Sequence, residues 1–151
     1  MRPGPGLCDI LSGNLLGKIK DVVREPEPRL HVILAGTRKG DPQELLASNR
    51  MNHLLLAVRE NYDLVILDTP PVLPVADALV LARHADATLM VVRWEKTARG
   101  AVRDAVRLLQ DSRAQILGAV MTRVDLRTAS RSGGRMAYAF TRYDGYHVAR
   151  T

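Results

Sequence analysis

An aspartate at the end of an apolar run is the residue of this sequence best placed to do chemistry. Leu64 to Leu67 form an unbroken apolar stretch that ends at Asp68, and Pro70 and Pro71 follow. Such a run predicts a strand buried on both faces, as in a parallel sheet covered by helices. Proline cannot continue a central strand, and open α/β sheets bind ligands at the carboxyl ends of their strands. Asp68 is therefore a candidate ligand-binding residue, with a plain strand cap as the alternative.

Other familiar catalytic arrangements do not occur in this sequence. The four histidines fall on separate predicted elements, with no two at the spacing of metal ligands, and there is no G-x-S-x-G nucleophile motif. There is also no G-x-x-x-x-G-K-[ST] loop, in which backbone N–H groups and a lysine bind phosphates. The nearest segment, Gly13 to Ile19, has one residue too few between its glycines, and we interpret it as a loop.

The hydrophobic pattern predicts alternating strands and helices. Predicted strands cover residues 30–35, 64–67, 88–92 and 115–121, and predicted helices cover residues 6–16, 18–24, 42–60, 74–84 and 97–112. Glu25 to Pro28 read as a linker because two prolines interrupt regular structure. Asp41 followed by Pro42 is a typical helix start. The order predicts an α/β fold with a mostly parallel sheet flanked by helices.

Composition fits one domain, or most of one, in a reducing compartment. The chain has 151 residues, 46% of them apolar, and its one cysteine, Cys8, excludes an internal disulfide. No apolar run approaches the ~20 residues of a membrane span. The net charge is +6, and the segment from Arg123 onward holds six arginines against two aspartates. Such a basic tail suits either a solvated terminus or an anionic partner.

Asp68-Thr69-Pro70-Pro71 after an apolar strand resembles the Walker B segment of the bacterial tyrosine kinases, the cytoplasmic ATPases of capsule and exopolysaccharide export. Residues 42–51 are similar to that family's Pro-x-Glu-Leu-Leu-x-Ser-x-Arg-Met segment, and residues 6–13 to its Gly-Leu-x-Asp-x-Leu-x-Gly segment. The match covers nearly all of residues 2–146. It implies a P-loop NTPase-like fold that is incomplete at the N-terminus, because the family's phosphate loop and second acidic strand precede these motifs.

The resemblance also implies domain limits and site residues. Residues 1–128 would form a partial kinase domain, and residues 129–151 a flexible tail. Asp68 would be the catalytic acid that orients magnesium and its waters at the phosphates and helps activate the attacking hydroxyl. The implied nucleotide-binding residues are Thr69, Pro70, Asp77, Thr122 and Arg123.

Two of these assignments stay open in the sequence. Asp77 is equally suited to be the N-cap of the following helix. Thr122 stands where the family usually carries an asparagine that can hydrogen-bond adenine, so base selectivity is not fixed.

Three of the four tyrosines lie in the last 14 residues, after a Ser-Gly-Gly segment. Tyr138, Tyr143 and Tyr146 resemble the family's tail of phosphorylated tyrosines, and a spacer tail is the alternative. The fourth, Tyr62, precedes the predicted buried strand and is expected to be poorly accessible. ATP and magnesium are the implied cofactors, provided that the missing N-terminal segment is supplied, so the chain alone is expected to be inactive.

The implied function is that of the C-terminal part of a protein-tyrosine kinase, which autophosphorylates its tail and regulates capsular or exopolysaccharide synthesis and export. Its implied partners are a membrane-embedded polysaccharide co-polymerase or activator and further copies of itself, at the cytoplasmic face of the inner membrane, with no specific nucleic acid. One alternative is a partition or septum-type ATPase that binds DNA or membrane. The other is a non-catalytic remnant that acts as an interaction module.

Overall fold

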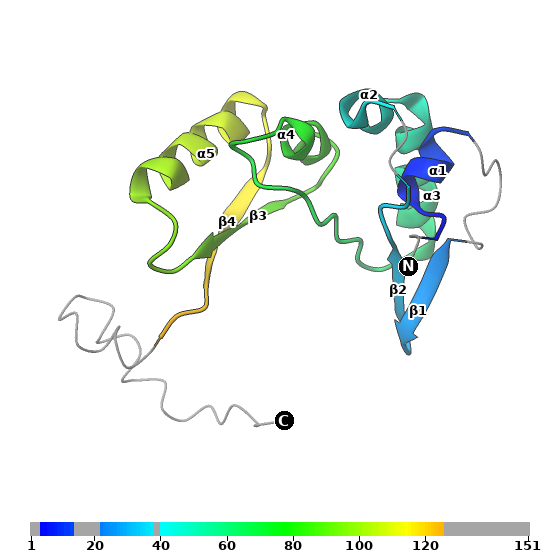
Figure 1. Ribbon diagram of the computed structural model, residues 1–151, viewed down its shortest axis with the longest axis horizontal. Coiled ribbons are helices and arrows are strands. Elements are labelled where there is room, and N and C mark those ends of the chain that lie inside the picture. Colours follow the sequence, from blue (N-terminus) through cyan, green and yellow to red (C-terminus); the bar gives the residue numbers. More distant parts are fainter. Residues whose placement is uncertain (1–3, 14–21, 38–39, 126–151) are drawn as a thin grey trace.

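The computed structural model describes residues 4–13, 22–37 and 40–125, which form two parts joined by a stretch over residues 62–76 that has no helix or strand (Figure 1). The first part contains α1 (Leu7–Leu11), β1 (Val23–Glu27), β2 (Leu30–Ile33), α2 (Pro42–Leu46) and α3 (Asn49–Asn61). The second contains α4 (Asp77–Ala82), β3 (Thr88–Arg93), α5 (Arg99–Asp111) and β4 (Ile116–Thr122). Helix α2 packs against α4 and so connects the two parts.

The second part is a β-α-β unit. Strands β3 and β4 pair in parallel, with Met90 opposite Ala119 and Arg93 opposite Thr122, and α5 is the connection between them. The apolar residues of α5 face inward, with Ala105 and Leu109 buried, and its arginines face outward. The predicted α/β class, with parallel strands and flanking helices, is confirmed.

The first part contains an antiparallel hairpin that the sequence analysis did not predict. Residues 18–24 were expected to form a helix and residues 25–28 a linker, but residues 23–27 form β1, which pairs with β2. The prediction was wrong because β2 supplies backbone partners that local propensity does not reveal. Pro26 fits because the register is irregular between Arg24 and Glu27, so no regular ladder bond from its nitrogen is needed.

The predicted helix over residues 42–60 is two helices, each with its own N-cap. The Asp41 carboxylate accepts a hydrogen bond from the Gln43 backbone N–H at 3.0 Å, as the sequence predicted. The Ser48 hydroxyl then accepts one from the Met51 N–H at 3.4 Å and starts α3. In α4 the N-cap is Ala76, and Asp77 is the first helical residue without a side-chain capping bond. The alternative that Asp77 is the N-cap of this helix is therefore wrong, because the N-cap is the residue before it.

The predicted buried strand over residues 64–67 is not present. Leu64 is 76% exposed and Ile66 is 80% exposed, and among the described residues no strand pairs with this stretch. A strand needs a neighbour for its backbone N–H and C=O groups, and the only described ladder partner of β3 is β4. Without such a neighbour the stretch stays extended with its backbone open to water.

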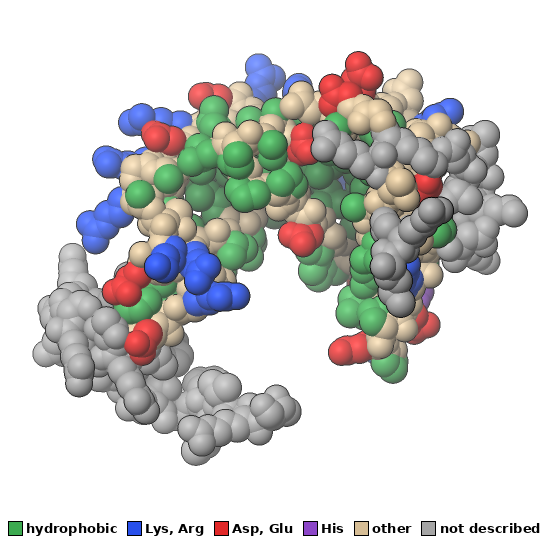
Figure 2. Space-filling model, in the orientation of Figure 1, with side chains coloured by type: hydrophobic (Ala, Val, Ile, Leu, Met, Phe, Trp, Pro, Cys, Tyr) green, Lys and Arg blue, Asp and Glu red, His purple; other side chains and the backbone are tan. Residues whose placement is uncertain are grey.

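The principal core lies in the first part and reaches α4. Leu11, Met51, Leu54 and Leu81 are buried together, and the partly buried side chains packed on them include Leu67. Within the ranges that the structure describes, no helix combines the length and apolar character that crossing a membrane requires. Figure 2 shows apolar side chains along the inner side of the arch that the two parts form.

Candidate functional site

Asp68 is positioned by the residue before it. Leu67 is partly buried and packs against the core, whereas Asp68, Thr69 and Pro70 are exposed on the stretch that joins the two parts. The core thus anchors the stretch directly beside the carboxylate. Because Asp68 is open to solvent, it is free to contact an ion or a ligand from outside.

Thr122 and Arg123 lie at the carboxyl end of β4. Thr122 is opposite Arg93 in the parallel pair, and its carbonyl accepts a hydrogen bond from the Trp94 N–H at 3.1 Å. Arg123 follows with a φ of 55°, in the left-handed region, where the chain leaves the sheet. The carboxyl ends of parallel strands are the edge at which α/β sheets bind ligands.

The same edge holds a cationic side chain that the sequence analysis did not single out. Arg93 ends β3 beside Thr122, and both Arg93 and Arg123 are exposed. Figure 2 shows a group of basic side chains over this end of the β3–β4 pair. A guanidinium suits phosphate recognition, and an arginine at the carboxyl end of a predicted strand was the signal that could have found it.

The predicted site residues occupy three separate places: the joining stretch, the first turn of α4 and the end of β4. Among the described residues no hydrogen bond or ion pair joins Asp68 to Asp77, Thr122 or Arg123. The predicted phosphoacceptors Tyr138, Tyr143 and Tyr146 lie outside the described residues.

The oxygen donors at Asp68 suit a magnesium ion that is held mainly by phosphates and water. Magnesium is typically held by one or two carboxylates together with substrate phosphates, and it keeps several waters. The exposed carboxylate of Asp68 and the hydroxyl of Thr69 are oxygen donors of that kind. The described part of the chain contains no cluster of three or more histidine, cysteine or acidic residues that could hold a metal by itself. The donor set therefore suits an ion bound mainly through phosphates and water.

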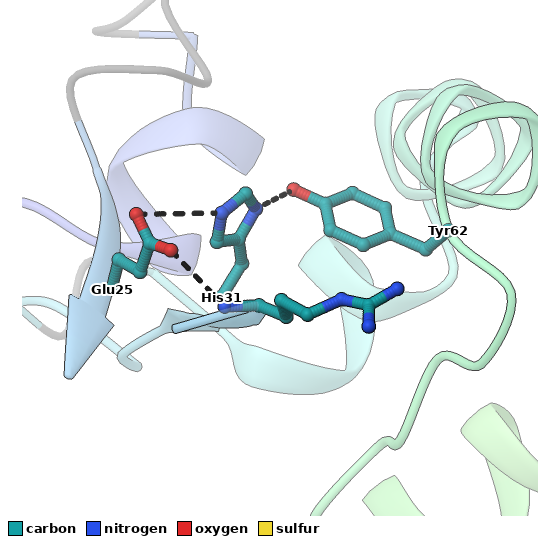
Figure 3. A network of polar contacts seen from close by, with 4 residues as sticks. Glu25, His31 and Tyr62 are labelled. Carbon is teal, nitrogen blue, oxygen red and sulfur yellow. Dashed lines mark hydrogen bonds and ion pairs between the residues drawn. The ribbon is translucent and has the colours of Figure 1, made fainter. Parts of the chain in front are cut away.

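A polar network links the β1–β2 hairpin to the start of the joining stretch (Figure 3). His31 Nδ1 lies 2.6 Å from the Tyr62 hydroxyl oxygen, and the two rings meet edge to face with centroids 5.4 Å apart. On its other side, His31 Nε2 lies 3.9 Å from Glu25 Oε2. Glu25 Oε1 accepts a hydrogen bond from the Arg29 N–H at the hairpin turn. Sequence reasoning missed this network because it did not predict that β1 pairs with β2.

Tyr62 was expected to be poorly accessible because a buried strand was predicted to follow it. The tyrosine is half-buried, and the side chains of Leu64 and Ile66 just beyond it are exposed. The premise of that expectation is therefore wrong.

Known proteins resemble this chain in both sequence and fold. EpsB of Ralstonia solanacearum is 41% identical over 143 residues, which is 94% of this chain and 19% of EpsB. The solved kinase domain of VpsO superposes with a TM-score of 0.75 at 31% identity, over 82% of this chain and 60% of that domain. The kinase domain of the Escherichia coli tyrosine kinase ETK gives 0.73 at 32% identity, over 83% of this chain and 50% of that domain. No protein-family model matches the chain.

The chain belongs to the bacterial tyrosine-kinase family. Identity above 30% over most of the chain, together with a shared fold, confirms the resemblance that the Asp68 to Pro71 segment indicated. The P-loop-type α/β class is confirmed by the same structures. The chain spans about a fifth of the length of EpsB and little more than half of the solved kinase domains.

Proposed function

We propose that this chain contributes part of the catalytic domain of a bacterial protein-tyrosine kinase. The observation that carries the proposal is the combined match to the VpsO and ETK kinase domains, with Asp68-Thr69-Pro70-Pro71 presented on an exposed stretch. Residues 1–128 form the kinase-domain portion in this proposal, and residues 129–151 form the substrate tail.

In this proposal each site residue has its own task. Asp68 orients a magnesium ion through water and assists removal of the proton from the attacking hydroxyl, since phosphoryl transfer depends mainly on positioning and charge neutralisation. Thr69 and Pro70 shape the turn beside the phosphates, and Asp77 lies in the first turn of the next helix. Thr122 and Arg123 lie beside the base or sugar of the nucleotide.

The edge of β3 and β4 adds positive charge to this arrangement. Arg93 is next to Thr122 in the ladder and exposed, so it is available to a phosphate of the nucleotide. ATP and magnesium are the proposed cofactors, and they require a phosphate-binding loop, which this sequence does not contain.

The proposed biological role is control of capsular or exopolysaccharide synthesis and export. Tyr138, Tyr143 and Tyr146 are the proposed phosphate acceptors, used between neighbouring copies of the chain. A membrane-embedded polysaccharide co-polymerase or activator is the proposed partner, which would hold the kinase at the cytoplasmic face of the inner membrane. The family relationship supports this role.

A chimera tests the proposed activity. The present chain replaces the matching region of the ETK kinase domain, and ATP-dependent tyrosine phosphorylation is measured by mass spectrometry. We expect phosphotyrosine to form, and Asp68→Asn to lower the rate by about a hundredfold or more, as for the loss of a metal-orienting acid. Asp104→Asn, at an exposed carboxylate on α5, is the matched control. A folded chimera without activity, or an unchanged rate in Asp68→Asn, would contradict the proposal.

One observation favours a second candidate, an interaction module. The β3–β4 pair exposes Val91 (69%) and Leu117 (74%), and the joining stretch exposes Leu64 and Ile66. Apolar side chains in such numbers favour covering by another polypeptide. This candidate predicts binding to a partner that Asp68→Asn leaves unchanged, which equilibrium sedimentation of the mixture would measure.

A further inference from the structure

The contact between Tyr62 and His31 has the arrangement of an activated hydroxyl. A nucleophile is typically activated by a base within hydrogen-bonding distance, and the base is oriented by a third group. Here the Tyr62 oxygen lies 2.6 Å from His31 Nδ1, and the opposite ring nitrogen faces the Glu25 carboxylate at 3.9 Å. The three side chains come from β1, β2 and the residue after α3, and they meet as Figure 3 shows.

The Glu25 carboxylate faces the Nε2 side of the His31 ring at 3.9 Å, which is an ion-pair distance and not a hydrogen bond. In the neutral ring its negative charge favours the tautomer with hydrogen on Nε2. Nδ1 is then an acceptor, and the Tyr62 O–H donates to it. The hydroxyl proton therefore already points at the atom that can remove it.

We propose that Tyr62 is a phosphorylation site of this chain, with His31 as the base and Glu25 as its positioning residue. The proposal rests on the proposed function, because a tyrosine kinase of this family must supply the phosphoryl group from a nucleoside triphosphate. The Tyr62 oxygen forms a bond to the γ-phosphorus, and the bond from that phosphorus to the β–γ bridging oxygen breaks. The nucleoside diphosphate leaves, and the phenolic proton moves to His31 Nδ1.

The chain around Tyr62 is open enough for a second kinase molecule to reach it. Tyr62 is the first residue after α3, and residues 64–71 have no helix or strand in the structure. Asp63 is exposed, and Leu64 and Ile66 are 76% and 80% exposed. An extended segment with unpaired backbone groups can lie along the surface of another protein, whereas a tyrosine within a helix or a paired strand cannot.

Phosphate on Tyr62 would also change how the hairpin is attached. The modification removes the O–H that Tyr62 donates to His31, and it adds about −1.5 to −2 charges beside Glu25. Repulsion from the carboxylate and the lost hydrogen bond both weaken the link between the β1–β2 hairpin and the joining stretch. Asp68, the proposed catalytic acid, follows six residues later on the same stretch.

The test uses the whole 151-residue chain as substrate for the ETK kinase domain with Mg-ATP. Mass spectrometry gives the initial rate at Tyr62 and, separately, at the tail tyrosines. We expect phosphate on Tyr62, and we expect both His31→Phe and His31→Asn to lower the Tyr62 rate by about tenfold or more with tail rates unchanged. Asparagine keeps a hydrogen-bond acceptor near the Nδ1 position, but its amide is not a base. A lower rate in this variant therefore reports lost proton transfer and not lost positioning of Tyr62. His84→Phe, at an exposed histidine, is the matched control.

Separate measurement of kcat and KM distinguishes proton transfer from a merely structural role. In both His31 variants the kcat for Tyr62 should fall with KM unchanged, whereas a lost position of Tyr62 would raise KM. An unchanged Tyr62 rate in both His31 variants would overturn the proposal. Phosphate on the tail without phosphate on Tyr62 would overturn it too and leave the proposed function standing. Absence of phosphate from both places would overturn this proposal together with the proposed use of the tail tyrosines, whereas the proposed catalytic role is tested separately by the chimera.

Discussion

Replacing Leu64 by alanine should destabilise this chain far less than the same replacement at Leu109. Leu64 belongs to the run that the sequence predicts to be a buried strand, and Leu109 belongs to the predicted helix over residues 97–112. In the structure Leu64 is 76% exposed on the joining stretch, whereas Leu109 is 1% exposed on the buried face of α5. The pair therefore tests whether residues 64–67 are a buried strand or an exposed stretch in the isolated chain.

The two expected losses differ several-fold. Full burial of a leucine side chain contributes about 1.5–3 kcal/mol, and roughly a quarter of Leu64 is shielded, so its loss should cost about 0.4–0.7 kcal/mol. Leu109→Ala removes a fully buried side chain and leaves a cavity, which typically costs about 2–5 kcal/mol. A domain of ordinary stability has about 5–15 kcal/mol in total, so only the second change brings it near unfolding.

Urea denaturation followed by circular dichroism measures both changes. With a slope of about 1.5 kcal/mol per molar, Leu109→Ala should lower the midpoint by about 1.3–3.3 M and Leu64→Ala by about 0.3–0.5 M. Equal effects, or a loss above about 2 kcal/mol for Leu64→Ala, would show that residues 64–67 are buried and would refute the reasoning. A loss below about 1 kcal/mol for Leu109→Ala would refute the assignment of Leu109 to a packed core.

Three further predictions follow from the same observations. The isolated chain should bind Mg-ATP only weakly, because it has no phosphate-binding loop; micromolar affinity in calorimetry that Asp68→Ala abolishes would contradict this. Asp41→Ala should cost about 1 kcal/mol in urea denaturation by removing the hydrogen bond to the Gln43 N–H, while Asp41→Ser should retain most of it. The isolated chain should self-associate in sedimentation experiments through its exposed apolar side chains, and Ile66→Lys should reduce that association; a monodisperse wild-type monomer that melts above about 65 °C would rule this out.

Local patterns predicted the second half of the described chain well. The hydrophobic pattern predicted a helix over residues 97–112, and α5 lies within that range with Ala105 and Leu109 inside and its arginines outside. The short apolar runs gave β3 and β4 to within one residue at each end. The start at Asp41 was right because a capping side chain and a proline act within a single turn. The single helix predicted over residues 42–60 was wrong because Ser48 caps the start of a second helix. The apolar pattern continues across this break and so does not reveal it.

The candidate site was predicted only as a set of residue types. Asp68 and its neighbours are recognisable because the motif is contiguous, so no knowledge of the fold is needed to find it. Arg93 and Thr122 are adjacent only through the pairing of β3 with β4. Glu25 meets His31 through the pairing of β1 with β2, and His31 meets Tyr62 because β2 lies beside the end of α3. Such groupings depend on strand register, which distant parts of a chain set together.

The sequence by itself determined the family, the α/β class and the helix start at Asp41, because these depend on contiguous motifs and on short-range periodicity. Tertiary structure decided whether the apolar run before Asp68 is buried. Leu64 to Leu67 have the composition of a central strand, but burial requires a neighbouring strand to satisfy their backbone groups, and the described chain pairs none with them. Tertiary structure likewise decided the surroundings of Tyr62, because the hydrogen bond to His31 spans 31 residues of sequence and depends on a hairpin that no local pattern revealed.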